Sequence, residues 1–389
     1  MKKLAIIGSG TRADYIAHAC KKLHVESHCF SLETLILEYR NKFDYYHVVD
    51  IFDFEKLLSL CKEININGVC ATTEITIAVA ARISTALALN GNPIIVAEQI
   101  TNKYLNREKT INIKGLKSPK FAEVFSPDDI ERLGFSYPLI LKPEAYAGGK
   151  QGVIVVSTRE NLEEAFRFTF NNVKKRFCSK VLAEEFIVGG TEYSVESLSY
   201  KKSHYIVQIT QKDTDKGIHC VELGHHQPAN LSKEMKAKVH RVITDSLTAI
   251  GLENGPCHSE IKIVNDIIYL IEFNARPGGD HISWPMVELS TGYPYIEGVV
   301  NIALDTFEPI DFSKLKNRYS GIYYVTEQTK HLKPVFDICD QFSWCWEKHK
   351  VSDSLEELTH NDLEHTNYFI YSSDNEDPVP SLLNKLNKE

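Results

Sequence analysis

The sequence lacks two features that would indicate a membrane or nucleic-acid protein: it has neither a long apolar run nor an excess of basic residues. Among 389 residues, 44 Lys+Arg stand against 52 Asp+Glu, which gives a formal net charge of -8 and no global field to attract nucleic acid. No apolar stretch approaches the roughly 18 residues of a membrane span. We expect a soluble chain of about two or three domains that binds neither nucleic acid nor a membrane. A homodimer is left open.

Paired cysteines and a leader segment are also missing. The chain has 9 cysteines, an odd number, and none of them forms a CxxC pair, which argues against a disulfide framework or a zinc ribbon. At the N-terminus the apolar stretch before Gly8 is too short for the core of a signal peptide and is typical of a first strand. We therefore expect a cytoplasmic protein.

Complete phosphate-binding fingerprints are absent. The glycine turn at residues 8–10 lacks the last glycine of GxGxxG, because Ala13 stands there, and the acidic residue after the second strand, Glu33, is displaced. We favour a tight turn in a doubly wound sheet, with a loop bordering a substrate or a nicotinamide site as the alternatives.

Strands and helices alternate over residues 1–97, which predicts an N-terminal α/β domain with a doubly wound parallel sheet. After the strand at 4–7, strands are expected at 47–49, 69–71 and 94–96, and helices at 55–63 and 75–89.

Paired strands replace this alternation from residue 98, which predicts an α+β domain over 98–310 with a small lid subdomain at about 120–190. The expected pairings are 139–142 with 152–156, 181–186 with 192–198 and 205–210, and 258–264 with 267–274. Helices are expected at 162–170 and at 233–250, where Gly251 stops the helix. A C-terminal subdomain over 311–389 would end in a frayed polar tail from Ser372.

The expected hairpin at 258–274 predicts a divalent-metal site. A loop over residues 265–267 would pair Val264 with Ile268, and counting outward places Glu260 opposite Glu272 with Asn274 on the same face. Opposed carboxylates destabilise a sheet unless a cation lies between them, and two carboxylates with an amide oxygen suit Mg²⁺. The alternative is a solvated hairpin with accidental acidic residues.

Two further segments are candidates for holding a nucleotide. Lys142 ends an apolar strand and precedes a glycine-rich loop, so that an ammonium and exposed N–H groups could hold phosphates, although the spacing is not that of a P-loop. Glu184 and Glu185 close another apolar strand, and Glu192 begins the next after a double-glycine turn. Acceptors and apolar walls of this kind suit a purine and a ribose, while ordinary hairpins are the alternative for both segments.

Taken in order, these segments resemble the ATP-grasp superfamily over about residues 1–310, which implies an ATP-grasp fold after the N-terminal domain. The resemblance implies that Lys103, within an NKxxxR-like segment, and Lys142 contact the phosphates of ATP. It places Glu184 or Glu185 at the adenine amino group. The remaining implied ATP contacts are Gly148, Gly149 and Gln151 in a closing loop, the Phe186–Ile187 backbone and, at the ribose, Glu192.

The resemblance also implies the reacting centre. Glu260, Glu272 and Asn274 would hold one or two Mg²⁺ ions, with Mn²⁺ as a substitute. Arg276 would lie beside the reacting acyl group, and the N–H groups of Gly278 and Gly279 would help it to stabilise an oxyanion.

Within the superfamily, residues 272–281 look like the carboxylate–amine ligases that join amino acids. In that branch Glu222 and His225 would border the substrate. Glu74, after the expected strand at 69–71, either meets a substrate amino group or caps the helix that follows. A zinc site formed by His219, Cys220, His225 and His226 is disfavoured, because their spacing fits no common pattern.

The implied activity is that of an ATP-dependent carboxylate–amine ligase, with small-molecule carboxylate and amine substrates, that forms an acyl phosphate and releases ADP and phosphate. An ATP-dependent carboxylase acting through carboxyphosphate is the main alternative. A non-catalytic ATP-binding protein is a further one, although it would be expected to have lost metal residues that are present here.

Overall fold

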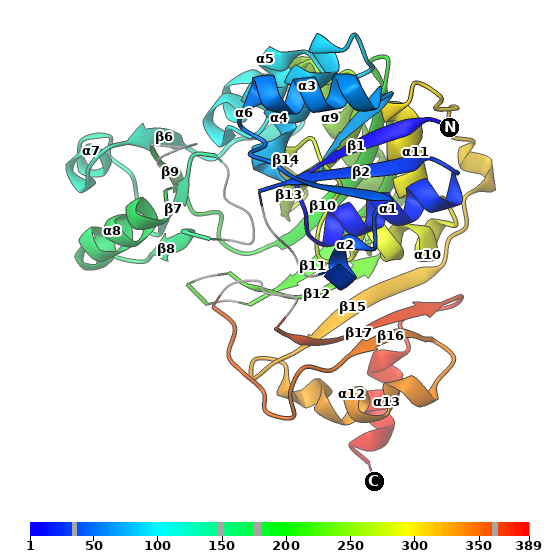
Figure 1. The fold of residues 1–389 in the computed structure, drawn as a ribbon. Coiled ribbons are helices and arrows are strands. Elements are labelled where there is room, and N and C mark those ends of the chain that lie inside the picture. Colours follow the sequence, from blue (N-terminus) through cyan, green and yellow to red (C-terminus); the bar gives the residue numbers. More distant parts are fainter. Residues whose placement is uncertain are drawn as a thin grey trace.

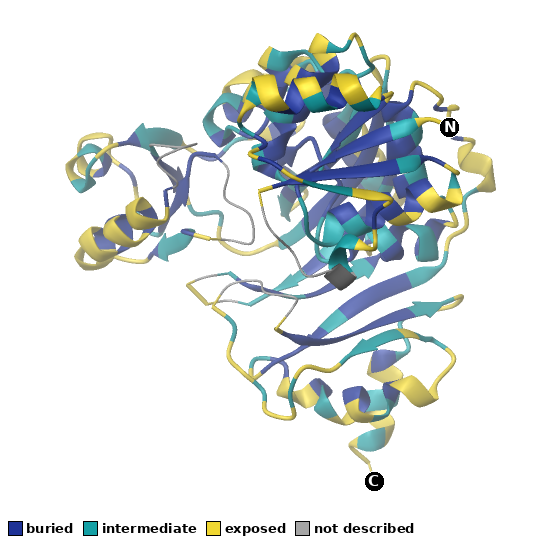
Figure 2. Ribbon diagram, viewed as in Figure 1, coloured by how far each residue is buried: buried dark blue, intermediate teal, exposed yellow. Residues whose placement is uncertain are grey.

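Within residues 1–32, 37–145, 151–173, 180–215, 217–218, 220–359 and 365–388, which the computed structural model describes, the chain forms three sheets (Figure 1). The N-terminal sheet and the longest sheet lie together, the third sheet projects to one side, and the C-terminal helices lie at the opposite end from the N-terminal unit. Strands in the interior are buried and the outer helix faces are exposed (Figure 2). None of the described helices is both long and apolar enough to cross a membrane.

The N-terminal sheet is parallel, with strand order β3-β2-β1-β4, as predicted for a doubly wound sheet. Its strands are β1 (Lys3–Ile7), β2 (Glu26–Ser31), β3 (Tyr45–Val48) and β4 (Gly68–Ala71), and its helices are α1 (Thr11–Lys22), α2 (Leu37–Arg40), α3 (Phe54–Ile64) and α4 (Glu74–Ala86). The glycine turn leads into α1, and Gly10 has a φ of 100° that favours glycine. Strands β1 and β4 are parallel neighbours in this sheet, so their carboxyl ends lie side by side.

The expected strand at 94–96 is wrong, because these residues begin helix α5 (Ile94–Gln99), which is followed by α6 (Lys103–Thr110). Pro93 precedes the first turn of α5, and the side chain of Ile95 is 59% exposed, whereas a central strand would bury it. A short apolar run does not by itself separate a strand from a helix.

The longest sheet contains nine described strands in the order β16-β17-β15-β12-β11-β10-β13-β14-β5. They are β5 (Leu116–Lys117), β10 (Thr191–Tyr200), β11 (Ser203–Thr214), β12 (Glu222–Gln227), β13 (Gly255–Val264), β14 (Ile267–Asn274), β15 (Tyr319–Val325), β16 (Cys345–His349) and β17 (Asn367–Ser373). Helix α9 (Lys233–Ile250) ends at Gly251 in the left-handed conformation, as predicted. Its apolar residues, including Val239 and Leu247, share a core with Val195 and Ile261 of the sheet.

The third sheet, called the lid sheet below, has the antiparallel order β6-β9-β7-β8. Its elements are β6 (Phe121–Val124), α7 (Pro127–Arg132), β7 (Leu139–Pro143), β8 (Ile154–Val156), α8 (Leu162–Asn172) and β9 (Val181–Glu185). The expected pairing of residues 181–186 with 192–198 is wrong, because β9 pairs with β6 and β7. Strand β10 instead belongs to the longest sheet, so the Gly189-Gly190 turn joins two sheets.

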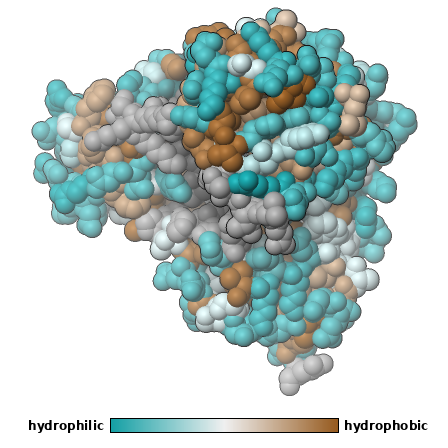
Figure 3. Space-filling model, viewed as in Figure 1, coloured by the Kyte–Doolittle hydropathy of each residue, from teal (hydrophilic) through white to brown (hydrophobic). Residues whose placement is uncertain are grey.

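The C-terminal segment extends the longest sheet through β15, β17 and β16, and strand β15 pairs directly with β12. Helices α10 (Val287–Thr291) and α11 (Tyr295–Ala303) precede it, and α12 (Lys333–Ile338) and α13 (Val379–Leu386) lie within it. The expected frayed tail from Ser372 is wrong: β17 continues to Ser373 and α13 follows. Strands on both sides of residue 310 share one sheet. The domain boundaries at 97/98 and 310/311 stay predictions. On the face shown in Figure 3, hydrophilic residues cover most of the surface.

Candidate active site

A cavity lies where the three sheets meet. The lid sheet contributes Lys142 and Glu184 to its wall, the longest sheet contributes charged residues of five strands, β10 to β14, and the N-terminal unit contributes Arg12 and Glu74. Segments far apart in the sequence therefore converge on one space.

The β13–β14 hairpin places Glu260 opposite Glu272, as predicted, but by a different route. The expected pairing of Val264 with Ile268 is wrong, because a two-residue turn pairs Val264 with Ile267. A bulge then leaves Ile271 without a directly opposite residue and shifts the register back by one. The two differences compensate each other before the strands reach the carboxylates.

Each of these two carboxylates is paired with a buried lysine. Lys103 Nζ lies 2.9 Å from Glu272 Oε2, and Lys212 Nζ lies 2.6 Å from Glu260 Oε1. Asn274 Nδ2 donates to Glu272 Oε1 at 2.8 Å, which joins the third predicted metal ligand to the same group. The hairpin therefore concentrates negative charge that cations balance, as the opposed carboxylates require.

Lys142 belongs to a second buried cluster. Its Nζ lies 2.7 Å from Glu184 Oε2, and Arg107 Nη2 lies 2.7 Å from Glu184 Oε1. Burial would raise the pKa of Glu184, but the two cations hold it below its ordinary value. Burial and the charge of Arg107 lower the pKa of Lys142, against the effect of Glu184. Arg107 also donates to the Ile271 carbonyl at 3.0 Å, so the cluster is fixed to the β13–β14 hairpin.

The other predicted nucleotide residues differ in their positions. Glu185, Phe186, Ile187 and Glu192 line the cavity, and Glu192 lies 3.7 Å from Lys262. Unlike the buried Glu184, Glu185 is exposed. Gln151 is exposed and is not among the described residues that line the cavity, while Gly148 and Gly149 lie outside the described residues.

Arg276 and Glu74 form a buried ion pair between the loop after β14 and the start of α4. Arg276 Nε donates to Glu74 Oε1 at 3.0 Å, and Nη2 contacts the same oxygen. Burial would raise the pKa of Glu74, but Arg276 and Arg12 lower it to about 2. The expectation that Glu74 caps the helix is wrong, because Thr73 is the N-cap and pairs with Thr76 in a capping box. Glu74 instead faces the cavity.

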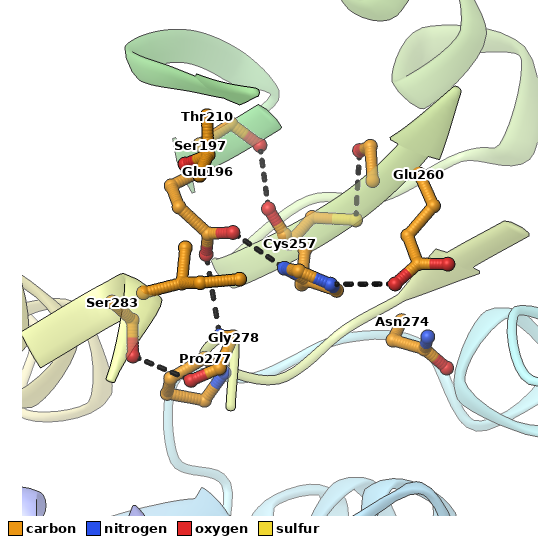
Figure 4. Close-up of polar contacts among 12 residues, drawn as sticks. Glu196, Ser197, Thr210, Cys257, Glu260, Asn274, Pro277, Gly278 and Ser283 are labelled. Carbon is orange, nitrogen blue, oxygen red and sulfur yellow. Dashed lines mark hydrogen bonds and ion pairs between the residues drawn. The ribbon is translucent and has the colours of Figure 1, made fainter. Parts of the chain in front are cut away.

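The Gly278 N–H, which was expected to help stabilise an oxyanion, is hydrogen-bonded to a carboxylate in this structure. It donates to Glu196 Oε2 at 3.2 Å, while Gly279 lines the cavity (Figure 4). The other oxygen of Glu196 contacts His258 Nδ1, and His258 Nε2 lies 3.1 Å from Glu260. Burial lowers the pKa of His258, but the two carboxylates raise it to about 9. Glu196 and His258 thus link the β13–β14 hairpin to the loop at Gly278 and Gly279.

The predicted substrate residues Glu222 and His225 lie on β12. Lys212 Nζ is 2.9 Å from Glu222 Oε1, and His225 Nε2 is 3.3 Å from Glu222 Oε2. Ligand atoms of Glu222, His225 and Asp280 all lie within 4.8 Å of one another.

The disfavoured zinc set is not assembled among the described residues. His226 contacts Asp213 at 2.9 Å and Tyr371 at 3.2 Å, away from His225, and His219 lies outside the described part of the chain.

Four residues of the site were not identified from the sequence: Arg12, Lys212, His258 and Asp280. His258 offered one signal, because it lies two residues before Glu260 and alternation places both on one face. Lys212 reaches Glu260 across β10, and Arg12 comes from the N-terminal unit, so neither contact follows from local spacing.

Comparison with known proteins agrees with this geometry. Residues 135–284 match the ATP-grasp domain model. An L-amino acid ligase from Bacillus licheniformis superposes with a TM-score of 0.80 and 24% identity, covering 100% of this chain and 98% of that one. The protein has an ATP-grasp fold.

The chain is also similar to the alanine–anticapsin ligase of Bacillus subtilis (strain 168), with 27% identity over 256 residues, 60% of this chain and 52% of that protein. The chain thus spans about half the length of the curated relatives it matches. The biotin carboxylase domain of Hydrogenobacter thermophilus 2-oxoglutarate carboxylase, in complex with MgADP, ADP and bicarbonate, has a TM-score of 0.74 and 16% identity, covering 96% and 86%. The predicted resemblance to the ATP-grasp superfamily is confirmed.

Proposed function

We propose that this ATP-grasp protein is an ATP-dependent carboxylate–amine ligase that joins amino acids through an acyl phosphate. The observation that carries the proposal is the convergence, in one cavity, of the paired carboxylates Glu260 and Glu272 with the Lys142 cluster and Arg276. Similarity to an L-amino acid ligase and to alanine–anticapsin ligase supports the choice of reaction.

The β13–β14 hairpin, called the metal hairpin below, has residues that fit a divalent cation. Two opposed carboxylates and the amide of Asn274 supply the hard oxygen donors that Mg²⁺ prefers, and Lys103 and Lys212 now balance their charge. Bound there, Mg²⁺ would neutralise charge on the phosphate oxygens of ATP. A cation at Glu272 would also release Lys103 from its ion pair, which leaves the ammonium for a phosphate.

The nucleotide lies, in this proposal, between the lid sheet and the longest sheet. Because Lys142 and Arg107 already hold Glu184, we assign the adenine end to Glu185, Phe186 and Ile187. Glu192 lies on β10, beyond the Gly189-Gly190 turn, where a ribose diol would reach it. Lys142 would bind a phosphate, because its ammonium lines the cavity while Glu184 holds its orientation.

The reaction then requires charge stabilisation and positioning. A substrate carboxylate oxygen attacks the γ-phosphorus and ADP leaves; the amine attacks the resulting acyl carbon, phosphate leaves, and the amine loses a proton. Arg276 is fixed by Glu74 on one side and donates to the Pro277 carbonyl at 2.9 Å on the other, so its guanidinium is held beside the metal hairpin.

The proposed function is tested by product analysis of the full chain with ATP, Mg²⁺ and pairs of amino acids. We expect ADP and phosphate, release that depends on one amino acid and rises with a second, and a hydroxamate when hydroxylamine replaces the amine. Formation of AMP would contradict the acyl-phosphate route. Turnover that requires bicarbonate and no amino acid would instead support the carboxylase.

A further inference from the structure

Arg12 presents an unpaired cation at the end of the cavity away from the lid sheet. Its Nη1 donates to the Thr72 carbonyl at 3.3 Å, while its buried Nε has no hydrogen-bond partner, and no described carboxylate lies within ion-pair distance. Burial and the charge of Arg276 lower the pKa of Arg12 to about 10. Arg12 is half-buried, and a partly desolvated guanidinium without a counter-ion is costly, so this position favours an anionic ligand.

Asp280 presents the opposite charge at the same end. It lines the cavity, and its carboxylate forms neither a hydrogen bond nor an ion pair with any described residue. Burial and the nearby Glu222 carboxylate raise the pKa of Asp280. Its backbone has a φ of 55°, a left-handed conformation that L-residues rarely adopt and that is often found at ligand sites.

A third group, the imidazole of His225, lies beside the carboxylates of Glu222 and Asp280. His225 is fully buried and its Nδ1 has no hydrogen-bond partner. With atoms of Glu222, His225 and Asp280 within 4.8 Å of one another, three acceptors surround one small space. An ammonium group carries three donors and suits such an arrangement.

The cation and the anion lie on either side of Gly279. A Cβ on this glycine would be 2.6 Å from Arg12 Nη2, and Asp280 is the next residue. Two neighbouring half-buried charges that have no ion-pair partner among the described residues are complementary to a ligand that carries both charges itself. We propose that Arg12 and Asp280 form the subsite for the amine-donating amino acid, with its α-carboxylate on Arg12 and its α-ammonium on Asp280, Glu222 and His225.

The subsite rests on the proposed ligase function and names its second substrate as a free α-amino acid. The carboxylate of the amine donor is not activated, so it keeps the negative charge that Arg12 requires. Amino-acid amides, esters and N-acyl amino acids each lack one of the two charges.

Calorimetry tests the subsite without relying on turnover. Free L-amino acids are titrated into the full chain with Mg²⁺ and a non-hydrolysable ATP analogue, followed by the carboxamide and the N-acetyl derivative of the tightest ligand. We expect wild type to favour the free amino acid over each derivative by roughly tenfold or more, as the loss of one charged hydrogen-bonding group implies.

Two variants must separate the two contacts. Arg12→Met should remove the preference over the carboxamide but keep that over the N-acetyl derivative, and Asp280→Asn should do the reverse. Lys22→Met, a basic residue of the same helix whose partners are Glu288 and Glu297, is the matched control and should keep both preferences.

Equal binding of all three ligands by wild type, or preferences unchanged in both variants, would overturn the subsite. Loss of one Mn²⁺ equivalent in Asp280→Asn with amino-acid discrimination unchanged would assign the cluster to a metal instead. Wild-type protein that discriminates as expected but releases no ADP with any amino-acid pair would contradict the proposed function and leave the subsite standing.

Discussion

The two ends of the cavity, which we assign to the nucleotide and to the substrate, differ in how their charged side chains are paired. Near the lid sheet, Glu184 is paired with both Lys142 and Arg107, each at 2.7 Å. At the other end, Arg12 and Asp280 are neighbours in space and neither has an ion-pair partner among the described residues. The first arrangement is complete without a ligand, and the second is not.

This difference indicates which part of the cavity the fold itself stabilises. A complete buried ion pair needs geometry and hydrogen bonds from the protein, and removing one partner is destabilising. An incomplete pair lowers stability until a ligand supplies the missing charges. We therefore expect substitutions at the two ends to change stability and ligand binding in different proportions.

The largest expected effect is on catalysis, at the hairpin that lies between the two ends. Glu272→Gln keeps the shape of the side chain and removes one metal-binding charge, so Mg-dependent ATP turnover should fall on the order of a thousandfold. ADP release measures it, and a cooperative thermal transition like that of wild type shows that the fold is intact. Near-normal turnover would remove Glu272 from the metal site. Glu288→Gln, on α10, is the control.

The next expected effect is on stability and separates the two ends directly. Glu184→Gln leaves two buried cations without their carboxylate and should cost about 3–5 kcal/mol in the free energy of unfolding. Asp280→Asn removes a carboxylate that has no partner and should cost less than about 0.5 kcal/mol, or raise stability. Urea unfolding of both variants provides the measurement. Equal destabilisation would show that the two ends do not differ as described.

A smaller effect is expected on the free energy of unfolding at acid pH, and it depends on the Glu74–Arg276 ion pair. The pKa of Glu74 is lowered to about 2 in the folded chain, from its ordinary value of 4.5. A lowered folded pKa stabilises the protein above the unfolded pKa, and this contribution, about 3 kcal/mol, is lost as pH falls from 4.5 toward 2. Glu74→Gln should lack this acid-dependent part of the unfolding free energy. Parallel pH profiles for wild type and variant would contradict the pairing.

The smallest of these effects concerns nucleotide affinity. Lys142→Met removes one charged contact to phosphate and should weaken ATP binding roughly tenfold, with Glu184 still held by Arg107. Titration calorimetry with Mg-ATP gives the affinity, and Lys22→Met again serves as the control. Unchanged affinity together with unchanged turnover would place Lys142 outside the nucleotide site.

The sequence predicted best what depends on short spacing and alternation. The glycine that ends α9 and the parallel sheet of the N-terminal unit follow local rules, and both are confirmed. The opposition of Glu260 and Glu272 was predicted with a loop one residue too long. It is correct only because a bulge at Ile271 restores the register, and the bulge has no signal in the sequence.

The contacts that the sequence could not predict join separate sheets. β9 was expected beside β10 because the two are adjacent in sequence, but it pairs within the lid sheet. Arg12 reaches the cavity because the N-terminal unit packs on the loop after β14. Tyr15 of α1, for example, contacts His281 of that loop, 266 residues further along the chain. Such packing depends on the whole fold, so the substrate end was the part least accessible to sequence reasoning.

The central claim, that a substrate carboxylate is phosphorylated by ATP before the amine attacks, is tested most directly by oxygen transfer. An amino acid labelled with ¹⁸O in its carboxylate is turned over with ATP, Mg²⁺ and a second amino acid, and the released phosphate is analysed by mass spectrometry. The acyl-phosphate route predicts one ¹⁸O atom in the phosphate for each peptide bond formed. Unlabelled phosphate, released while the label stays wholly in the product or appears in AMP, would contradict it.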